Sequence, residues 1–242
     1  DSLLVRELTA KAFCRVETFG TCREAQWRAD NIDFSGELTT FDVLRGGHSF
    51  GRYRSPLAGM FNVRNCLGVI AACESLGLER DAIADSLVEF KSVKRRMEVR
   101  GVVRGVTVID DFAHHPTAVR ETLQGARQKY PGGRLIAVFE PRSYTAQLKV
   151  FQRDFEESLA LADVIVVAGL FHPERYTSQT GASPQEMSEH LRAFGKDATY
   201  LPGPEEIVEM LVRRVESGDV VVVMSNGSFG GIHGKLLSAL AG

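Results

Sequence analysis

The sequence lacks several features that would place it in a specialised class of protein. No apolar run reaches the roughly 18 residues that a membrane-spanning helix needs. Its four cysteines form no CxxC pair and no zinc-ligand spacing, which favours reduced thiols over a disulfide framework. With a formal net charge of -2, the chain has no basic field to attract nucleic acid. We therefore expect a cytoplasmic protein that binds neither nucleic acid nor membrane.

What is present suits a folded protein with one large domain or two small ones. The chain has 242 residues, of which 44% are hydrophobic, enough to fill substantial cores. The pattern of apolar residues changes after the basic stretch KSVKRRMEVRG. We place a domain boundary at Arg96, which divides the chain into residues 1–96 and 97–242.

The first part is predicted to combine antiparallel strands with two helices. Residues 1–58 contain the alternating runs FCRVETF, LTTFDVLR and HSFGRYR, and Gly46 and Gly47 separate the last two as in a hairpin. From Gly59 onward, apolar residues recur at helical spacing, and a second helix is predicted over 80–90.

The second part repeats strand, loop and helix. EVRGVVRGVTVID is predicted to be a hairpin, and RLIAVFE, DVIVVAG, ATYL and DVVVVMS are apolar runs typical of buried parallel strands. Helical patterns cover 117–130, 148–161, 204–215 and 231–240, and another helix begins at Ser183 and Pro184. This alternation predicts an α/β, Rossmann-like domain with a mostly parallel sheet. Ligands of such sheets gather beyond the carboxyl ends of the strands.

The loop DDFAHHP follows one such strand. Asp110 and Asp111 leave the strand where a carboxylate can accept hydrogen bonds from a ribose or help to hold a cation. Pro116 suits the first turn of a helix, whose free N–H groups favour a nearby anion. The alternative is that one Asp caps the helix and His114 and His115 bond backbone carbonyls. A zinc site is disfavoured because no third ligand stands at a customary spacing.

Other candidate residues are individually ambiguous. The glycines of SNGSFGG could admit an anionic ligand to the backbone or could serve turn geometry alone. Arg142 and the pair Glu174 and Arg175 stand at strand ends, where they could bind charged groups or simply be solvated. Asn62 and Asn65 share one helix face and could bond an adenine edge or act as surface residues.

Five stretches together closely resemble the Mur ligase family, in order and over nearly the whole chain. They are PLAGMFNVRNCLGVIAA, KRRMEVRG, VIDDFAHHPTAV, VFEPRSYT and VVVVMSNGSFGGIHGKLL. Within the family the chain most resembles the members that join UDP-N-acetylmuramate to the murein tripeptide L-alanyl-gamma-D-glutamyl-meso-diaminopimelate. The members that add L-alanine to the same nucleotide share DDFAHHPTA. The resemblance implies that residues 1–96 are the C-terminal portion of a central ATPase domain and residues 97–242 a complete C-terminal domain.

The resemblance also implies roles for individual residues, with ATP and Mg²⁺ as cofactors and Arg96 and Asp111 as the catalytic pair. The residues implied for the nucleotide are Asn62, Asn65, Arg96, Asp111, His114, His115 and Thr117. The residues implied for the acceptor substrate are Arg142, Ser143, Glu174, Arg175, Ser225, Asn226, Gly227 and Gly230. No metal ligand is implied within the chain. Phe61 departs from the family, which commonly has His before the first Asn.

The family's reaction passes through an acyl phosphate and needs no protein nucleophile, so it implies catalysis by positioning and charge neutralisation. The sequence contains no GxxGK[ST] phosphate-binding loop and does not begin with methionine. We therefore expect an excised piece of a ligase that cannot catalyse alone. Two alternatives are an L-alanine-adding ligase and a non-catalytic module that binds nucleotide or peptide.

Overall fold

The computed structural model describes residues 3–177 and 179–242. The chain divides into two compact units between Lys91 and Ser92. This division lies a few residues before the boundary predicted at Arg96, so Arg96 belongs to the second unit together with Asp111. None of the helices in the described part of the chain is both long and apolar enough to cross a membrane.

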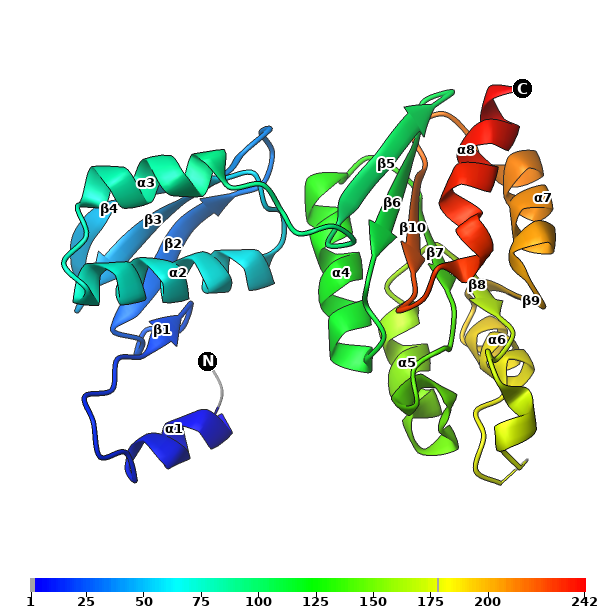
Figure 1. Ribbon diagram of the computed structural model, residues 1–242, viewed down its shortest axis with the longest axis horizontal. Helices are drawn as coiled ribbons and strands as arrows, with labels where there is room; N and C mark the ends of the chain where they lie inside the picture. The colour runs from blue at the N-terminus through cyan, green and yellow to red at the C-terminus, as the bar shows by residue number, and fades with distance from the viewer. Residues whose placement is uncertain (1–2, 178) are drawn as a thin grey trace. The chain divides into compact units, whose positions relative to one another are not determined.

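The first unit is a four-stranded sheet with two helices packed on it (Figure 1). Its elements are α1 (Leu3–Thr9), β1 (Phe19–Gly20), β2 (Trp27–Asp33), β3 (Thr39–Arg45), β4 (His48–Ser55), α2 (Met60–Ser75) and α3 (Arg80–Glu89). Strands β2, β3 and β4 are antiparallel, as predicted, and Gly46 and Gly47 form the turn of the hairpin, both at positive φ.

The strand predicted over FCRVETF is wrong for most of its length. Only Phe19 and Gly20 form β1, which pairs with β2 in parallel. Phe13 in this run is fully exposed, whereas the Phe19 ring lies against α2 at Gly68. Its end is instead held by side chains, because Thr18 and Gln26 exchange hydrogen bonds between side chain and backbone at 3.0 and 3.1 Å.

The core of the first unit lies on one face of its sheet. Trp27, Phe41, Phe50 and Tyr53 are buried there, and the rings of Trp27 and Phe50 meet edge-on with centroids 4.9 Å apart. Helices α2 and α3 supply the opposing apolar side chains. The intervening strand residues are more exposed, so the alternation in the sequence correctly predicted a sheet with one covered face.

The second unit contains a six-stranded sheet in the order β5-β6-β10-β7-β8-β9. Its strands are β5 (Glu98–Val103), β6 (Val106–Asp111), β7 (Leu135–Phe139), β8 (Val164–Ala168), β9 (Asp197–Leu201) and β10 (Val220–Met224). Its helices are α4 (Pro116–Lys129), α5 (Gln152–Leu159), α6 (Pro184–Ala193), α7 (Pro204–Arg214) and α8 (Ile232–Ala241). Only β5 is antiparallel to its neighbour, so the α/β class with a mostly parallel sheet is confirmed.

Four 3₁₀ turns interrupt the connections: η1 (Thr145–Gln147), η2 (Lys149–Phe151), η3 (Pro173–Arg175) and η4 (Phe229–Gly231). The helix predicted over 148–161 therefore starts late, with α5 beginning at Gln152. The cause is a tertiary contact, because Leu148 bridges to Gly181 and the Lys149 N–H donates to the Thr180 carbonyl at 2.9 Å.

Helices cover both faces of this sheet (Figure 1). Helices α4, α5 and α6 pack on one face, and α7 and α8 pack on the other. Strand β10 lies between β6 and β7, yet the helix that follows it covers the face opposite to α4 and α5. The carboxyl end of β10 is thus a topological switch point, the place where α/β sheets bind ligands.

Candidate functional site

Asp111 ends β6 and is 3% exposed. Its carboxylate accepts hydrogen bonds from the backbone N–H groups of Met97 and Ala113, both at 2.8 Å, and from the Thr122 hydroxyl at 3.1 Å. Burial raises the pKa of Asp111, and these donors and the charge of Arg96 offset only part of that effect. Asp111 therefore ties together the start of the unit, the loop after β6 and α4, and its role toward a ribose stays a prediction.

Arg96 is exposed, and its charge acts on Asp111 within the same unit. The two residues that the resemblance implies as the catalytic pair therefore lie in one unit. The segment containing Arg96 is fastened to β6, because the Phe112 N–H donates to the Arg95 carbonyl at 2.8 Å. Arg96 is thus held close to the end of β6 with its guanidinium in solvent.

Arg95, the residue before Arg96, is partly buried and holds the end of β6 to the loop after β10. Its guanidinium donates to Asp110 at 3.4 Å and to the carbonyls of Ser225 and Gly227, the latter at 2.8 Å. One side chain thereby joins the end of β6 to the loop after β10. The family resemblance implied a nucleotide-binding and catalytic role for Arg96, and the sequence analysis did not single out Arg95.

Asp110 faces two arginines and a histidine at the end of β6. It lies 3.4 Å from Arg95, 3.5 Å from Arg100 and 3.3 Å from the Nε2 atom of His233. Burial alone would raise the pKa of Asp110, but His233 and Arg95 outweigh burial and hold the pKa below its ordinary value. The contact with His233 lacks hydrogen-bond geometry.

The loop after β10 meets the loop after β7. The Ser225 hydroxyl donates to Glu140, a 7% exposed carboxylate, and Arg142 lies 3.7 Å from the same carboxylate. Arg142 also covers the ring of Phe171, with its guanidinium carbon 3.4 Å from the ring centroid. A Cβ at Gly227 would lie 2.2 Å from the Arg142 Nε, so this position needs glycine for Arg142 to sit where it does. The predicted residues Arg142, Ser225 and Gly227 are thus brought together.

Ser143 and the histidines line the adjoining loops. The Ser143 hydroxyl donates to the His114 carbonyl at 3.1 Å, which links the loops after β7 and β6. His114 bonds the Phe112 carbonyl through Nδ1 at 2.7 Å, as the non-functional alternative for the histidines had it. His115 and Thr117 are exposed at the start of α4, and no side chain caps this helix. Its first N–H groups therefore remain available to an anion.

The remaining acceptor-side residues lie at the edges of this cluster. Glu174 and Arg175 are exposed in η3, where the Nδ1 atom of His172 lies 2.9 Å from Glu174. Backbone hydrogen bonding of Glu174, with help from His172, lowers the pKa of this carboxyl. The Oδ1 atom of Asn226 is buried without a partner, and Gly230 adopts positive φ just before α8.

Asn62 and Asn65 share one face of α2 in the first unit, as predicted. The Asn62 side chain donates to the Ala58 carbonyl at 2.7 Å, and the Asn65 side chain donates to Asn62 at 3.4 Å. Both amides thus have local partners, and their role toward an adenine stays a prediction.

Exposed Arg96 and the uncapped start of α4 suit a phosphate-bearing ligand at the end of β6. A magnesium site does not fit as well. Over residues 3–177 and 179–242, no three His, Cys, Asp or Glu side chains gather to hold a metal ion. The carboxylates of Asp110, Asp111 and Glu140 are engaged by donors of the chain itself.

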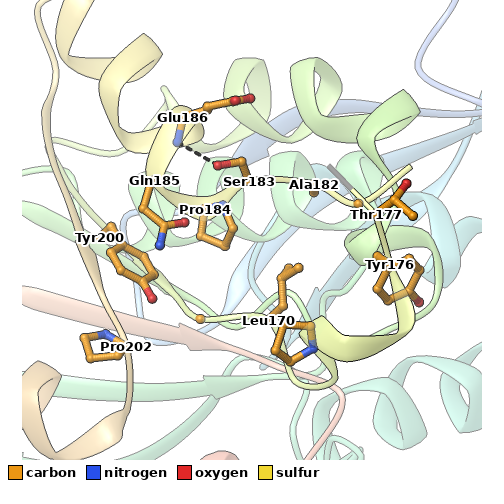
Figure 2. Close-up of a pocket in the computed structure, with 13 residues that line it drawn as sticks. Leu170, Tyr176, Thr177, Ala182, Ser183, Pro184, Gln185, Glu186, Tyr200 and Pro202 are labelled. Atoms are coloured by element: carbon orange, nitrogen blue, oxygen red, sulfur yellow. Dashed lines mark hydrogen bonds between the residues drawn. The ribbon is translucent and has the colours of Figure 1, made fainter. Parts of the chain in front are cut away.

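A cavity of about 450 Å³ opens beside this cluster, between the carboxyl ends of β8 and β9 and the start of α6 (Figure 2). Its walls come from three segments: Gly169–Leu170, the turn around Tyr176, and Ser183–Glu186, with Tyr200 and Pro202 closing the far side. No pattern in the sequence predicts this cavity, because its lining is assembled from loops that are separate in the sequence.

Two family matches cover most of the chain. Residues 95–227 match the Mur ligase, glutamate ligase domain, and residues 1–73 match the Mur ligase middle domain. The chain is 34% identical over 210 residues to the UDP-N-acetylmuramate–L-alanine ligase of Desulfitobacterium hafniense, covering 87% of this chain and 46% of that relative. It is 36% identical over 219 residues to the UDP-N-acetylmuramate–L-alanyl-gamma-D-glutamyl-meso-2,6-diaminoheptandioate ligase of Escherichia coli, covering 90% and 45%.

A solved structure of a similar ligase also aligns with nearly the whole chain. The murein peptide ligase of Psychrobacter arcticus aligns with a TM-score of 0.66 and 30% identity, covering 98% of this chain and 49% of that one. The chain therefore spans about half the length of the relatives it matches.

Proposed function

This chain belongs to the Mur ligase family, and from that premise we propose that it forms part of an ATP-dependent amide-bond ligase acting on UDP-N-acetylmuramate. The observation that carries the proposal is the match on both sides of the division at Lys91, with the middle-domain and C-terminal regions in order. A stand-alone binding module would have no need of the middle-domain region.

In the proposed reaction the muramate carboxylate attacks the γ-phosphate of ATP, which releases ADP and leaves an acyl phosphate. The amine of the acceptor then attacks the acyl carbon, phosphate leaves, and the amine loses a proton as the amide forms. The work of this chain is positioning and charge balance. Arg96, exposed at the end of β6, is suited to phosphate, and Asp111 holds the backbone around it in place.

We propose the murein tripeptide as the acceptor, bound at the cluster of Arg142, Ser225 and Gly227. Arg142 lies between Glu140 and Phe171 at the switch point, where it is suited to a substrate carboxylate. The 36% identity to the Escherichia coli relative supports this choice.

L-alanine is the second candidate acceptor. It is favoured by relatives such as the Desulfitobacterium hafniense ligase, which is 34% identical. Identities of 34% and 36% do not separate the two acceptors, so binding must decide.

Calorimetric titration of the chain with the tripeptide and with L-alanine, each alone, distinguishes the candidates. We expect tripeptide binding that weakens about tenfold or more in Arg142→Ala, since a charge-assisted contact is lost. The matched control is Arg153→Ala, an exposed arginine on α5 that pairs with Glu157 on the same helix, and it should bind like the parent chain. Unchanged affinity in Arg142→Ala would remove its proposed role, and binding of L-alanine without the tripeptide would favour the second candidate.

A further inference from the structure

We propose that Arg95 is a positioning residue, which holds the loop after β10 in the shape that keeps Arg142 in place for the acceptor. The guanidinium of Arg95 is turned into the chain, toward Asp110 and the carbonyls of Ser225 and Gly227. Arg95 therefore acts on the acceptor through Arg142 and not by direct contact. The inference rests on the proposed function, because it takes Arg142 to bind the acceptor.

The backbone of Arg95 is itself held on both sides. Its N–H donates to the Glu98 carboxylate at 2.8 Å, and its carbonyl accepts from the Phe112 N–H at 2.8 Å. Its φ of 60° lies in the left-handed region, which residues other than glycine adopt only where surrounding contacts impose it. The side chain of Arg95 thus starts from a fixed point beside the end of β6.

The guanidinium of Arg95 bonds three groups at once. Its Nη2 atom donates to the carbonyls of both Ser225 and Gly227, the latter at 2.8 Å, and its Nε atom donates to Asp110 at 3.4 Å. Two carbonyls that lie two residues apart are thereby drawn to one nitrogen, which fixes the curve of the backbone between them. Arginine suits this task because it presents several donors in a rigid plane, whereas lysine presents a single nitrogen.

Gly227 transmits this constraint to Arg142. A Cβ at Gly227 would lie 2.2 Å from the Arg142 Nε, so the Arg142 side chain packs directly against the Gly227 backbone. The Gly227 N–H also donates to the Ser225 hydroxyl at 2.9 Å. The loop after β10 therefore bounds one side of Arg142, and the ring of Phe171 bounds another. A shift of Gly227 would remove the first of these two boundaries.

The Asp110 carboxylate keeps other partners when Arg95 is removed. Arg100 lies 3.5 Å from this carboxylate, and His233 lies 3.3 Å from it. Removal of Arg95 therefore leaves Asp110 paired, but it takes a charged donor away from both loop carbonyls. We expect the loop to lose its fixed shape while the unit stays folded.

A double-mutant cycle on binding of the murein tripeptide tests this role by calorimetry. Arg95→Ala should weaken binding about tenfold, because Arg142 is no longer held in place. In an Arg142→Ala background, Arg95→Ala should have little further effect, because both substitutions remove the same contact with the acceptor. If the two losses instead multiply, Arg95 acts independently of Arg142 and the proposal is wrong.

Two further variants separate position from charge. Arg100→Ala is the matched control, since it also removes an arginine that faces Asp110, and it should bind the tripeptide like the parent chain. Arg95→Lys keeps the positive charge beside Asp110, so its unfolding in urea should match that of the parent chain. Its tripeptide affinity should still fall several-fold, because one ammonium nitrogen replaces the fork. Full affinity in Arg95→Lys would refute the role of the fork.

A measurement without ligand separates this inference from the proposed function. The Arg142 guanidinium lies over the Phe171 ring, so the ring shields the Arg142 side-chain signals in an NMR spectrum. This shielding should be lost in Arg95→Ala and kept in Arg100→Ala. Unchanged Arg142 signals in Arg95→Ala would overturn the role of Arg95 and leave the proposed acceptor standing. Failure of the tripeptide to bind the parent chain would overturn the proposed acceptor, and the NMR signals would still decide whether Arg95 positions Arg142.

Discussion

The two units solve the burial of a sheet in different ways. In the first unit, strand residues alternate between a core shared with α2 and α3 and a polar face. In the second unit, β7, β8 and β10 are buried along their whole length, because helices cover both faces. Since both faces are occupied, the second unit can present functional side chains only at the strand ends, and its charged cluster lies there. A sheet covered on both faces thus concentrates chemistry at its edge.

Asparagine substitutions in adjacent strand residues test this difference most strongly. Val222 and Val223 point to opposite faces of β10 and are both fully buried, so Val222→Asn and Val223→Asn should each cost about 3 kcal/mol. In β3 of the first unit, Val43→Asn should cost a similar amount, and Asp42→Asn less than about 1 kcal/mol.

Urea unfolding measures these costs. Trp27 is the only tryptophan and belongs to the first unit, so its fluorescence follows that unit while circular dichroism follows both. Tolerance of asparagine at either Val222 or Val223 would contradict a sheet buried on both faces.

A smaller effect is expected at the charged corner. Asp110→Asn removes the partner of Arg95, Arg100 and His233 and should lower the free energy of unfolding by about 2 kcal/mol at pH 7. Because the folded protein lowers the pKa of Asp110, this stabilisation is present above the ordinary value of 3.8 and is lost as pH falls through the lowered pKa. The difference from the parent chain should therefore close only in acid.

Denaturant titrations at a series of pH values, followed by circular dichroism, provide the measurement. Asp42→Asn in the first unit, whose carboxylate is more exposed, is the control. A cost at Asp110 that persists unchanged in acid would show that the charge is not its source.

The smallest effect concerns an aromatic contact confined to the first unit. The guanidinium carbon of Arg45 lies 4.8 Å from the ring centroid of Trp27, and Arg45→Ala should cost about 1 kcal/mol and shift the Trp27 emission. Arg52→Ala, on the polar face, should cost less than about 0.5 kcal/mol and leave the emission unchanged. Equal effects of the two variants would argue against the ring contact.

Sequence patterns predicted the second unit better than the first. Continuous apolar runs located β7, β8 and β10, because burial on both faces leaves no room for polar residues. The strand predicted from the run FCRVETF was wrong for most of its length, because alternation alone does not provide a surface to pack against. At the site, the loops after strands identified Asp110, Asp111, Arg142 and Ser225 as candidates.

The sequence pattern did not indicate which of the neighbours Arg95 and Arg96 is buried. Arg95 is partly buried and Arg96 is exposed, and the backbone takes positive φ at Arg95 and Met97, which no residue type there predicts. Glu140 was likewise missed as a partner, since its contact with Ser225 joins residues 85 positions apart in the sequence.

Strand β10 is the last strand in the chain yet lies in the middle of its sheet. Neither β6 nor β7 can complete its ladder until β10 inserts between them. The contacts that seat its loop join Arg95 to carbonyls 130 and 132 positions away. The region proposed to meet the acceptor accordingly depends on contacts between residues far apart in the sequence, which are slow to form during folding.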